Sequence, residues 1–394
     1  MLLANLELGE ERHVRNTLAF KISAIIFAVT VMQGGPVLGA QLSESTYDRI
    51  WQFANWYDDS ENPVVQSVNF SGRFQYEFAA LSADQGSHEE WKLRRMRLGV
   101  KTELFDQLTL HFEADFDPQG RNPTYKRLTD FYAEWSRSDA LALTVGKQGV
   151  GFTMDGSTSS KELMTIDRSN LANNMWFPQE YVPGVSVSGE LGRWVYHLGG
   201  FSSGEANREF GRFSGSTFGL ATLGYDLSES LSAEDSLLAV NYIYQSPDID
   251  NTFTRMLQHM VSVNFRYEQD RWGVRTDVSS ASGYLGQSDL WGLTVMPFFN
   301  VTDKLQVVAR QTYLTSEQAD GVRLARYENR VTDNMGNLID TRGDRYNEFY
   351  AGVNYYFYGH KLKLQSGLQF GDMNDLGVDT YSGVSSVTGM RVSW

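Results

Sequence analysis

Cysteine is absent from the 394-residue chain, and proline is scarce, with only 8 residues. The lack of cysteine excludes a disulfide framework, a thiolate metal site and a cysteine nucleophile, and it is compatible with export through an oxidising compartment. Long apolar runs are also missing: charged residues make up 21% of the chain, and its mean hydropathy is −0.36. These values do not indicate a helical membrane protein, but a β-barrel can have them because only alternate residues of its strands face lipid.

Basic residues are few relative to acidic ones, 34 against 48, which gives a net charge of −14. Such a charge argues against a nucleic-acid partner. Aromatic residues and glycine are plentiful by contrast, with 20 Tyr, 23 Phe, 9 Trp and 36 Gly. This composition favours a large sheet with aromatic girdles. A soluble secreted β-sandwich or lectin is the alternative that composition leaves open.

The N-terminal residues have the pattern of a secretory signal peptide. Lys21 precedes a short apolar run, 22–32, and small residues follow up to Ala40. The run is too short to span a bilayer as a helix, whereas a basic flank, a short apolar region and a small-residue exit are typical of an export signal. We therefore predict a signal peptide over residues 1–40 and a destination in the cell envelope.

A short helical segment is predicted at 41–63, on the periplasmic side of the main domain. Residues 43–57 read as an amphipathic helix with Ile50, Phe53 and Trp56 on one face. We expect this segment to act as a plug or tether through packing rather than as a binding site.

The main domain, 64–394, is dominated by segments in which apolar and polar residues alternate. In one of them Phe112 and Phe116 lie on one face, and Glu113 and Asp115 lie on the other. Alternation of this kind predicts strands with one apolar face. Sixteen such segments occur, at roughly 67–80, 91–105, 108–117, 127–136, 140–148, 183–190, 193–202, 215–227, 234–246, 256–268, 271–283, 287–300, 303–315, 345–358, 360–371 and 384–394.

The connections between these segments alternate between short turns and long loops, except that 284–286 is short where a long loop is due and the turn 228–233 is slightly long. Transmembrane barrels sort their connections in this way, with short turns at the periplasmic rim and longer loops outside, and single-chain bacterial barrels have an even number of strands. A soluble sandwich has no reason to do so. The predicted fold is all-β, a 16-stranded antiparallel transmembrane β-barrel. The predicted long connections are 81–90, 118–126, 149–182, 203–214, 247–255, 316–344 and 372–383.

The connection 149–182 is the third outer loop of this arrangement, and it has a helical pattern in its middle. Long structured loops within a run of regular hairpins are usually functional. We therefore predict an inward-folded third outer loop that narrows the pore.

The last strand ends on an aromatic residue. Met390, Val392 and Trp394 share one face, which fits a lipid-facing girdle at the strand end. We expect Trp394 also to be part of the signal that the barrel insertion machinery reads.

Several motifs together resemble the phosphate-selective porin O and P family of Gram-negative outer membranes. They are, in chain order, NFSGRFQYEF, WKLRRMRLGVKTELFDQLTLHFEADF, DFYAEW, LTVGKQ, SSKELMTIDRSN and VPGVSVSG. The resemblance implies a homotrimer of 16-stranded barrels that passes small inorganic anions, phosphate among them, and that contacts outer-membrane lipid and lipopolysaccharide. It also implies a pore lined by arginines, with lysines near the constriction, and no cofactor.

A pore selects by the charges at its narrowest part, so the candidates for anion selection are basic residues on the polar faces of strands or in the third loop. On the segment 91–105, Arg95, Arg97 and Lys101 share the polar face. The full set of predicted anion-selecting residues is Arg73, Arg95, Arg97, Lys101, Lys161, Arg168, Arg275 and Arg310. The alternative is that the arginines form ion pairs within the barrel wall. The acidic candidates for that pairing are Glu77, Glu103, Glu113, Asp115 and Glu134.

Other functions remain open at this stage. The channel could be general or could prefer cations, given the excess of acid, and the chain could be a non-channel binding module or adhesin. An enzyme of the outer-membrane phospholipase kind would need a serine beside His111 or His259, and no GxSxG motif surrounds a plausible nucleophile. The histidines are scattered and form no metal-ligand cluster. We therefore predict no enzyme activity and no metal.

Overall fold

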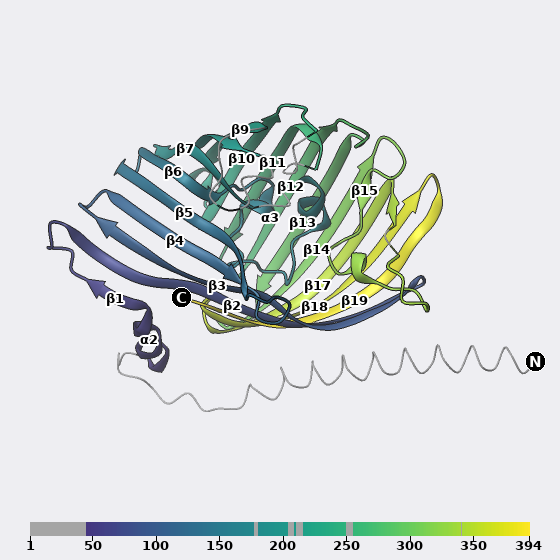
Figure 1. Ribbon diagram of the computed structural model, residues 1–394, viewed down its shortest axis with the longest axis horizontal. Coiled ribbons are helices and arrows are strands. Elements are labelled where there is room, and N and C mark those ends of the chain that lie inside the picture. Colours follow the sequence, from purple (N-terminus) through teal and green to yellow (C-terminus); the bar gives the residue numbers. More distant parts are fainter. Residues whose placement is uncertain (1–44, 177–179, 204–208, 210–215, 250–254, 340) are drawn as a thin grey trace, which may run out of the picture. The chain divides into compact units, whose positions relative to one another are not determined.

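The computed structural model describes residues 45–176, 180–203, 209, 216–249, 255–339 and 341–394 (Figure 1). The predicted signal peptide, 1–40, lies outside the described residues. No described helix is long and apolar enough to cross a membrane.

Sixteen strands close into an antiparallel barrel in chain order, with the first strand, β2, paired to the last, β19 (Figure 1). The predicted all-β, 16-stranded fold is therefore confirmed. The barrel strands are β2 (Val65–Ala83), β3 (Gly86–Leu104), β4 (Leu108–Phe116), β5 (Tyr125–Ser138), β6 (Leu141–Gly149), β7 (Tyr181–Leu191), β8 (Trp194–Ser202), β9 (Thr217–Asp226), β10 (Asp235–Gln245), β11 (Leu257–Gln269), β12 (Trp272–Gly283), β13 (Leu290–Asn300), β14 (Leu305–Ser316), β17 (Arg345–Tyr358), β18 (Leu362–Asp375) and β19 (Val378–Ser393).

The two faces of the wall differ as the alternation predicts. On β4, Phe112 is 45% exposed, whereas its neighbour Glu113 is only 1% exposed. In a barrel the exposed apolar face meets lipid and the polar face points inward. The interior of this barrel is therefore where the charged side chains of the wall gather.

Two of the predicted long loops, 81–90 and 372–383, are wrong. The hairpin between β2 and β3 turns at 84–85, and the hairpin between β18 and β19 turns at 376–377. Residues 84–90 are polar on both faces, and the apolar residues of 372–383 do not alternate regularly with polar ones. The period that marks a strand therefore disappears although the ladder of hydrogen bonds persists.

The segment before the barrel is only partly helical. The helix α2 (Thr46–Trp51) and the 3-10 turn η1 (Gln52–Ala54) are followed by the strand β1 (Asn55–Asp58), which pairs with β2 between Ser67 and Asn69. The prediction of a helix over the whole of 43–57 is therefore wrong, because the end of this segment, from Asn55 on, is an extended strand paired to the edge of the barrel.

Two connections carry most of the structure outside the wall. The third loop, residues 150–180, contains α3 (Met154–Ser157) and α4 (Asn170–Met175). Each helix begins with a side-chain cap, Thr153 for α3 and Ser169 for α4. The seventh loop, residues 317–344, contains the small hairpin of β15 (Val322–Arg323) and β16 (Arg342–Gly343) and the 3-10 turn η3 (Glu328–Arg330).

Candidate channel constriction

The third loop is hydrogen-bonded to the buried polar face of the wall. Its backbone carbonyls accept from Lys363 Nζ on β18 at 2.7 Å, from Arg310 Nη1 on β14 at 2.8 Å and from Arg391 Nη2 on β19 at 3.1 Å. At the start of the loop, the N–H of Met154 donates to Asp277 on β12 at 2.6 Å. Since these side chains are buried, the loop lies against the arc of wall that runs from β12 to β2.

Several of the predicted basic residues are paired within this wall. Arg73 lies 3.1 Å from Glu113, and Arg97 lies 3.7 Å from the same carboxylate. Arg310 lies 2.7 Å from Glu348. The pairing alternative therefore holds for these three arginines, two of them through a predicted partner.

Lys161 and Arg168 have partners close to the third loop itself. The Lys161 ammonium donates to the main-chain oxygen of Trp394 at 2.9 Å. Arg168 donates to the carbonyls of Asp155 at 2.7 Å and Thr158 at 2.9 Å, and its guanidinium lies 4.4 Å from the Trp176 ring centroid. Arg168 is thus fixed in one orientation.

Lys101 on β3 and Arg275 on β12 differ from the other predicted residues. Both are half-buried, and neither has an ion pair within the described part of the chain. The structure does not bring these two residues to the third loop.

Three of the predicted arginines meet around one acidic residue, Glu180, at the end of the third loop. Arg97 lies 3.7 Å from its carboxylate, Arg95 lies 3.8 Å away and Arg168 lies 3.9 Å away. Burial alone would raise the pKa of Glu180, but Arg168, Arg95 and Arg97 hold this pKa below its usual range. We call these four residues the Glu180 cluster.

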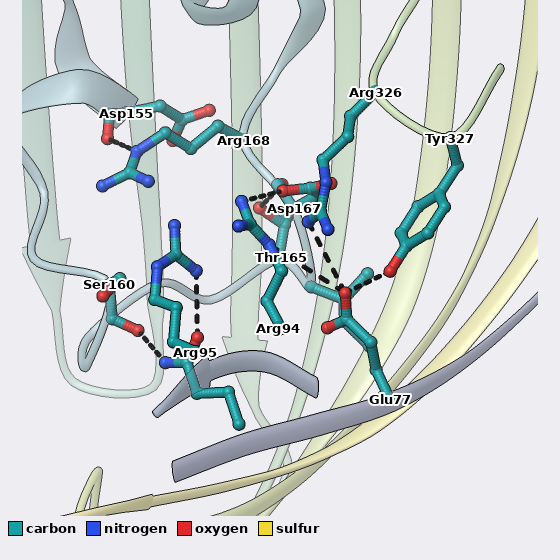
Figure 2. A network of polar contacts seen from close by, with 12 residues as sticks. Glu77, Arg94, Arg95, Asp155, Ser160, Thr165, Asp167, Arg168, Arg326 and Tyr327 are labelled. Atoms are coloured by element: carbon teal, nitrogen blue, oxygen red, sulfur yellow. Dashed lines mark hydrogen bonds and ion pairs between the residues drawn. The ribbon is translucent and has the colours of Figure 1, made fainter. Parts of the chain in front are cut away.

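A second charged network, centred on Glu77 and Asp167, joins the wall to both loops (Figure 2). Arg326 lies 3.3 Å from Asp167 and 3.5 Å from Glu77. Arg94 lies 3.5 Å from Asp167 and 4.0 Å from Glu77. Tyr327 donates a hydrogen bond to Glu77.

Sequence reasoning missed most of this second network. Strict alternation places Arg94 on the apolar face of its strand, but a bulge opposite Gln75 and Tyr76 turns it inward with Arg95. Arg391 also pairs with Glu77. It lies on the face of the last strand that points away from lipid, so alternation could have assigned it to the barrel interior. Arg326 could not be found, because it belongs to a loop with no period.

The seventh loop packs on the third loop. Asn170 donates to the carbonyl of Arg323 at 2.8 Å, and the N–H of Arg323 donates to Asn174 at 2.9 Å. A cavity of only about 20 Å³ lies between Ile166–Arg168 and Ala325–Tyr327. This is about the space of one water molecule, so the two loops pack closely against each other here.

A larger cavity, with a volume of about 960 Å³, lies against the opposite wall, formed by β5 to β8. It reaches the short turns at the ends of these strands. Arg137 is the only arginine or lysine among its described lining residues. The acidic lining residues are Asp106, Asp130, Glu134, Asp139 and Glu190. The barrel interior therefore has an acidic wall on one side and an arginine-rich wall under the two loops on the other. We call the second the basic arc; its arginines include Arg73, Arg94, Arg95, Arg97 and Arg391.

Features of an enzyme or a metal centre are few. His111 Nε2 lies 3.3 Å from Ser71 Oγ, but no described carboxylate hydrogen-bonds this imidazole to orient it as a base. His259 contacts the Tyr242 hydroxyl rather than a serine. Among the described residues no group of three metal-binding side chains occurs.

Comparison with solved structures shows the same fold in outer-membrane proteins. A loop-deletion mutant of OmpT from Vibrio cholerae is 14% identical, with a TM-score of 0.57 over 83% of this chain and 99% of that one. An anion-selective porin from Comamonas acidovorans is 12% identical, with a TM-score of 0.58 over 83% and 99%. The channel DcaP of Acinetobacter baumannii is 14% identical, with a TM-score of 0.52 over 83% and 97%.

Comparison with curated proteins gives no significant match. The family model of the phosphate-selective porins O and P, however, matches residues 68–296, which is more than half of the chain. Together with the closed 16-stranded barrel, this match supports an outer-membrane channel. The chain belongs to the phosphate-selective porin O and P family.

Proposed function

We propose that the protein forms a water-filled channel for the passive diffusion of small anions, phosphate among them, with the third and seventh loops as its constriction. One observation supports this most strongly. Arginine nitrogens with no hydrogen-bond acceptor in the described structure are buried along the basic arc, namely Arg73 Nε, Arg94 Nε, Arg95 Nε and Nη2, Arg97 Nε and Arg391 Nη1. A buried donor without an acceptor is costly, and water and passing anions would supply the acceptors.

The arginine pairs do not remove this positive character. Arg95 has a single described hydrogen bond, from Nη1 to Gln75 at 2.9 Å, and its nearest carboxylate is 3.8 Å away. Arg95 is therefore the residue that we place first in anion selection, with Arg94, Arg97, Arg168 and Arg326 around it. Lys101 and Arg275 would act as more distant positive charges, because no described carboxylate pairs with them.

The reversal potential of the purified protein in a planar bilayer under a KCl gradient tests this function. We expect a chloride-selective reversal and a chloride current that falls when phosphate is added. A conducting but cation-selective protein would contradict the anion preference, and a preparation without conductance would contradict the channel itself.

A cation-preferring channel is the second candidate, and the acidic cavity favours it. Five carboxylates and one arginine line that cavity, and fixed charges of one sign enrich ions of the other. The same reversal measurement decides between the two candidates.

Export and assembly complete the proposal. From the N-terminal pattern we propose cleavage of residues 1–40 and a periplasmic position for 41–63. We also propose insertion through Trp394, contact with lipopolysaccharide and, as the family resemblance implies, a homotrimer. N-terminal sequencing of the mature protein tests the first point, with residue 41 expected first. Cross-linking in detergent tests the last, with a trimer expected.

A further inference from the structure

The carboxylate of Glu180 lies among the three arginines of its cluster. The backbone of Glu180 is held next to the wall, since its carbonyl accepts from the N–H of Val150 at 2.9 Å. Its carboxylate then reaches three guanidinium groups that come from two elements: Arg95 and Arg97 from β3, and Arg168 from the third loop. The Glu180 carboxylate therefore faces three cations, one of which, Arg97, also lies 3.7 Å from Glu113 and 3.9 Å from Asp115.

None of the three described contacts is a hydrogen bond. A well-formed pair of guanidinium and carboxylate has N–O distances of about 2.7–2.9 Å, whereas these distances are 3.7, 3.8 and 3.9 Å. Arg95 is 5% exposed, and its Nη2, the atom nearest to Glu180, is buried without an acceptor in the described chain. The carboxylate compensates the charge of the site but does not satisfy its donors.

The guanidinium groups are fixed independently of Glu180. Arg168 is held by two backbone carbonyls of its own loop. Arg97 donates to the Tyr181 hydroxyl and lies 4.8 Å from the centroid of that ring. Arg95 is held by Gln75. The cluster would therefore keep its shape if the carboxylate moved away, and a preorganised site binds an anion without a large cost of ordering.

We infer that Glu180 is a built-in competitor that occupies an anion-binding site, and that a tetrahedral oxyanion with two negative charges, such as inorganic phosphate, binds there by displacing its carboxylate. This rests on the proposed channel function. A tetrahedral oxyanion offers more acceptor oxygens than a carboxylate, and arginine forks match its geometry. Its second charge suits a site where cations outnumber carboxylates: with Arg73 and Arg127 included, five arginines surround Glu180, Glu113 and Asp115.

Protonation does not vacate this site. Because Arg168, Arg95 and Arg97 hold the pKa of Glu180 below its usual range, this carboxylate stays ionised at neutral pH. Release therefore requires a competing anion, which makes occupancy a function of anion concentration.

The test compares two neutral variants of the third loop, Glu180→Gln and Glu162→Gln. Glu162 is an exposed carboxylate of the same loop and has no ion pair in the described structure. Its replacement changes the net charge by the same amount as Glu180→Gln but leaves the Glu180 cluster intact. The measurement is the phosphate concentration that halves the chloride current in a planar bilayer. We expect Glu180→Gln to lower this concentration about tenfold, which corresponds to about 1.4 kcal/mol, and Glu162→Gln to leave it nearly unchanged.

The outcomes separate this inference from the channel proposal. If the wild type conducts but both variants respond alike to phosphate, or if Glu180→Gln weakens the phosphate effect, the competitor role is refuted while the channel stands. If the wild type does not conduct, the channel proposal fails first. Adding Arg95→Gln to Glu180→Gln should abolish the gain.

Glu180→Asp covers the case in which the neutral variant does not assemble, as judged by heat-modifiable migration on a gel. It retains the charge but withdraws the carboxylate by one methylene, so we expect a phosphate effect between those of the wild type and Glu180→Gln. An unchanged phosphate effect in Glu180→Asp would count against the inference.

Discussion

Tyr327 donates a hydrogen bond to Glu77, although the two residues are 250 positions apart in the chain. Glu77 also pairs with Arg391 and lies 3.5 Å from Arg326, so one carboxylate on β2 connects the seventh loop to the last strand. The constriction that we propose would therefore depend on the wall and on both loops.

Replacing Tyr327 by phenylalanine should loosen the seventh loop. The change removes one buried hydrogen bond, for which we expect a loss of about 1 kcal/mol, and it should raise and broaden the single-channel conductance. Bilayer recordings measure the conductance, and the temperature of the heat-modifiable gel shift measures the stability. Tyr225→Phe is the control, because the Tyr225 hydroxyl has no hydrogen bond in the described chain. Equal conductance and stability of the two variants would count against a stabilising role for the hydrogen bond between Tyr327 and Glu77.

Anion selectivity should fall between pH 7 and pH 9. Burial, followed by the charge of Arg73, lowers the pKa of Lys161 in the third loop to about 8. Lysine is charged below its pKa and neutral above it, so the constriction loses a positive charge as the pH rises through this value. Reversal potentials at the two pH values measure the change. Lys161→Arg stays charged and should remove most of the pH dependence, and a variant with the wild-type profile would refute the assignment.

Stability should fall as the pH rises from about 5 to 7. Burial and then the charge of Glu348 raise the pKa of Glu328 in the seventh loop to about 7. A carboxyl group whose pKa is higher in the folded state binds more protons there than in the unfolded state, so this contribution is present at low pH and is lost through the window. The heat-modifiable shift temperature should depend less on pH in Glu328→Gln. Glu317→Gln, at an exposed position of the same loop, should behave as the wild type does.

Neutralising the acidic cavity should strengthen anion selectivity. Glu134 and Glu190 line this cavity, and their charges oppose anion entry. We expect Glu134→Gln with Glu190→Gln to raise the chloride-to-potassium permeability ratio about twofold. The double change Asp58→Asn with Glu61→Gln, at exposed positions before the barrel, is matched in charge and should have no effect. A ratio that stays constant in the first variant would place the conducting path elsewhere.

The sequence was sufficient for the barrel because each strand carries its own period of two. It was also sufficient for Arg73, Arg95 and Arg97, since alternation alone assigns them to the polar face, where the structure buries them. It was insufficient for Arg94, because a bulge breaks the period, and for Arg326, because nothing local ties a residue of the seventh loop to Glu77. Contacts between distant loops depend on closure of the whole ring, which no short stretch encodes.

The short strand β1 has a consequence for how the barrel closes. The last strand stops at Ser393, opposite Arg73, whereas β2 begins at Val65. The edge of β2 beyond this point would present unpaired backbone groups, and β1 covers part of it by pairing with Ser67 and Asn69. Bare strand edges recruit strands from other molecules. The residues ahead of the barrel thus cover part of the exposed edge of β2 at its seam, which disfavours pairing of this edge with a strand of another chain.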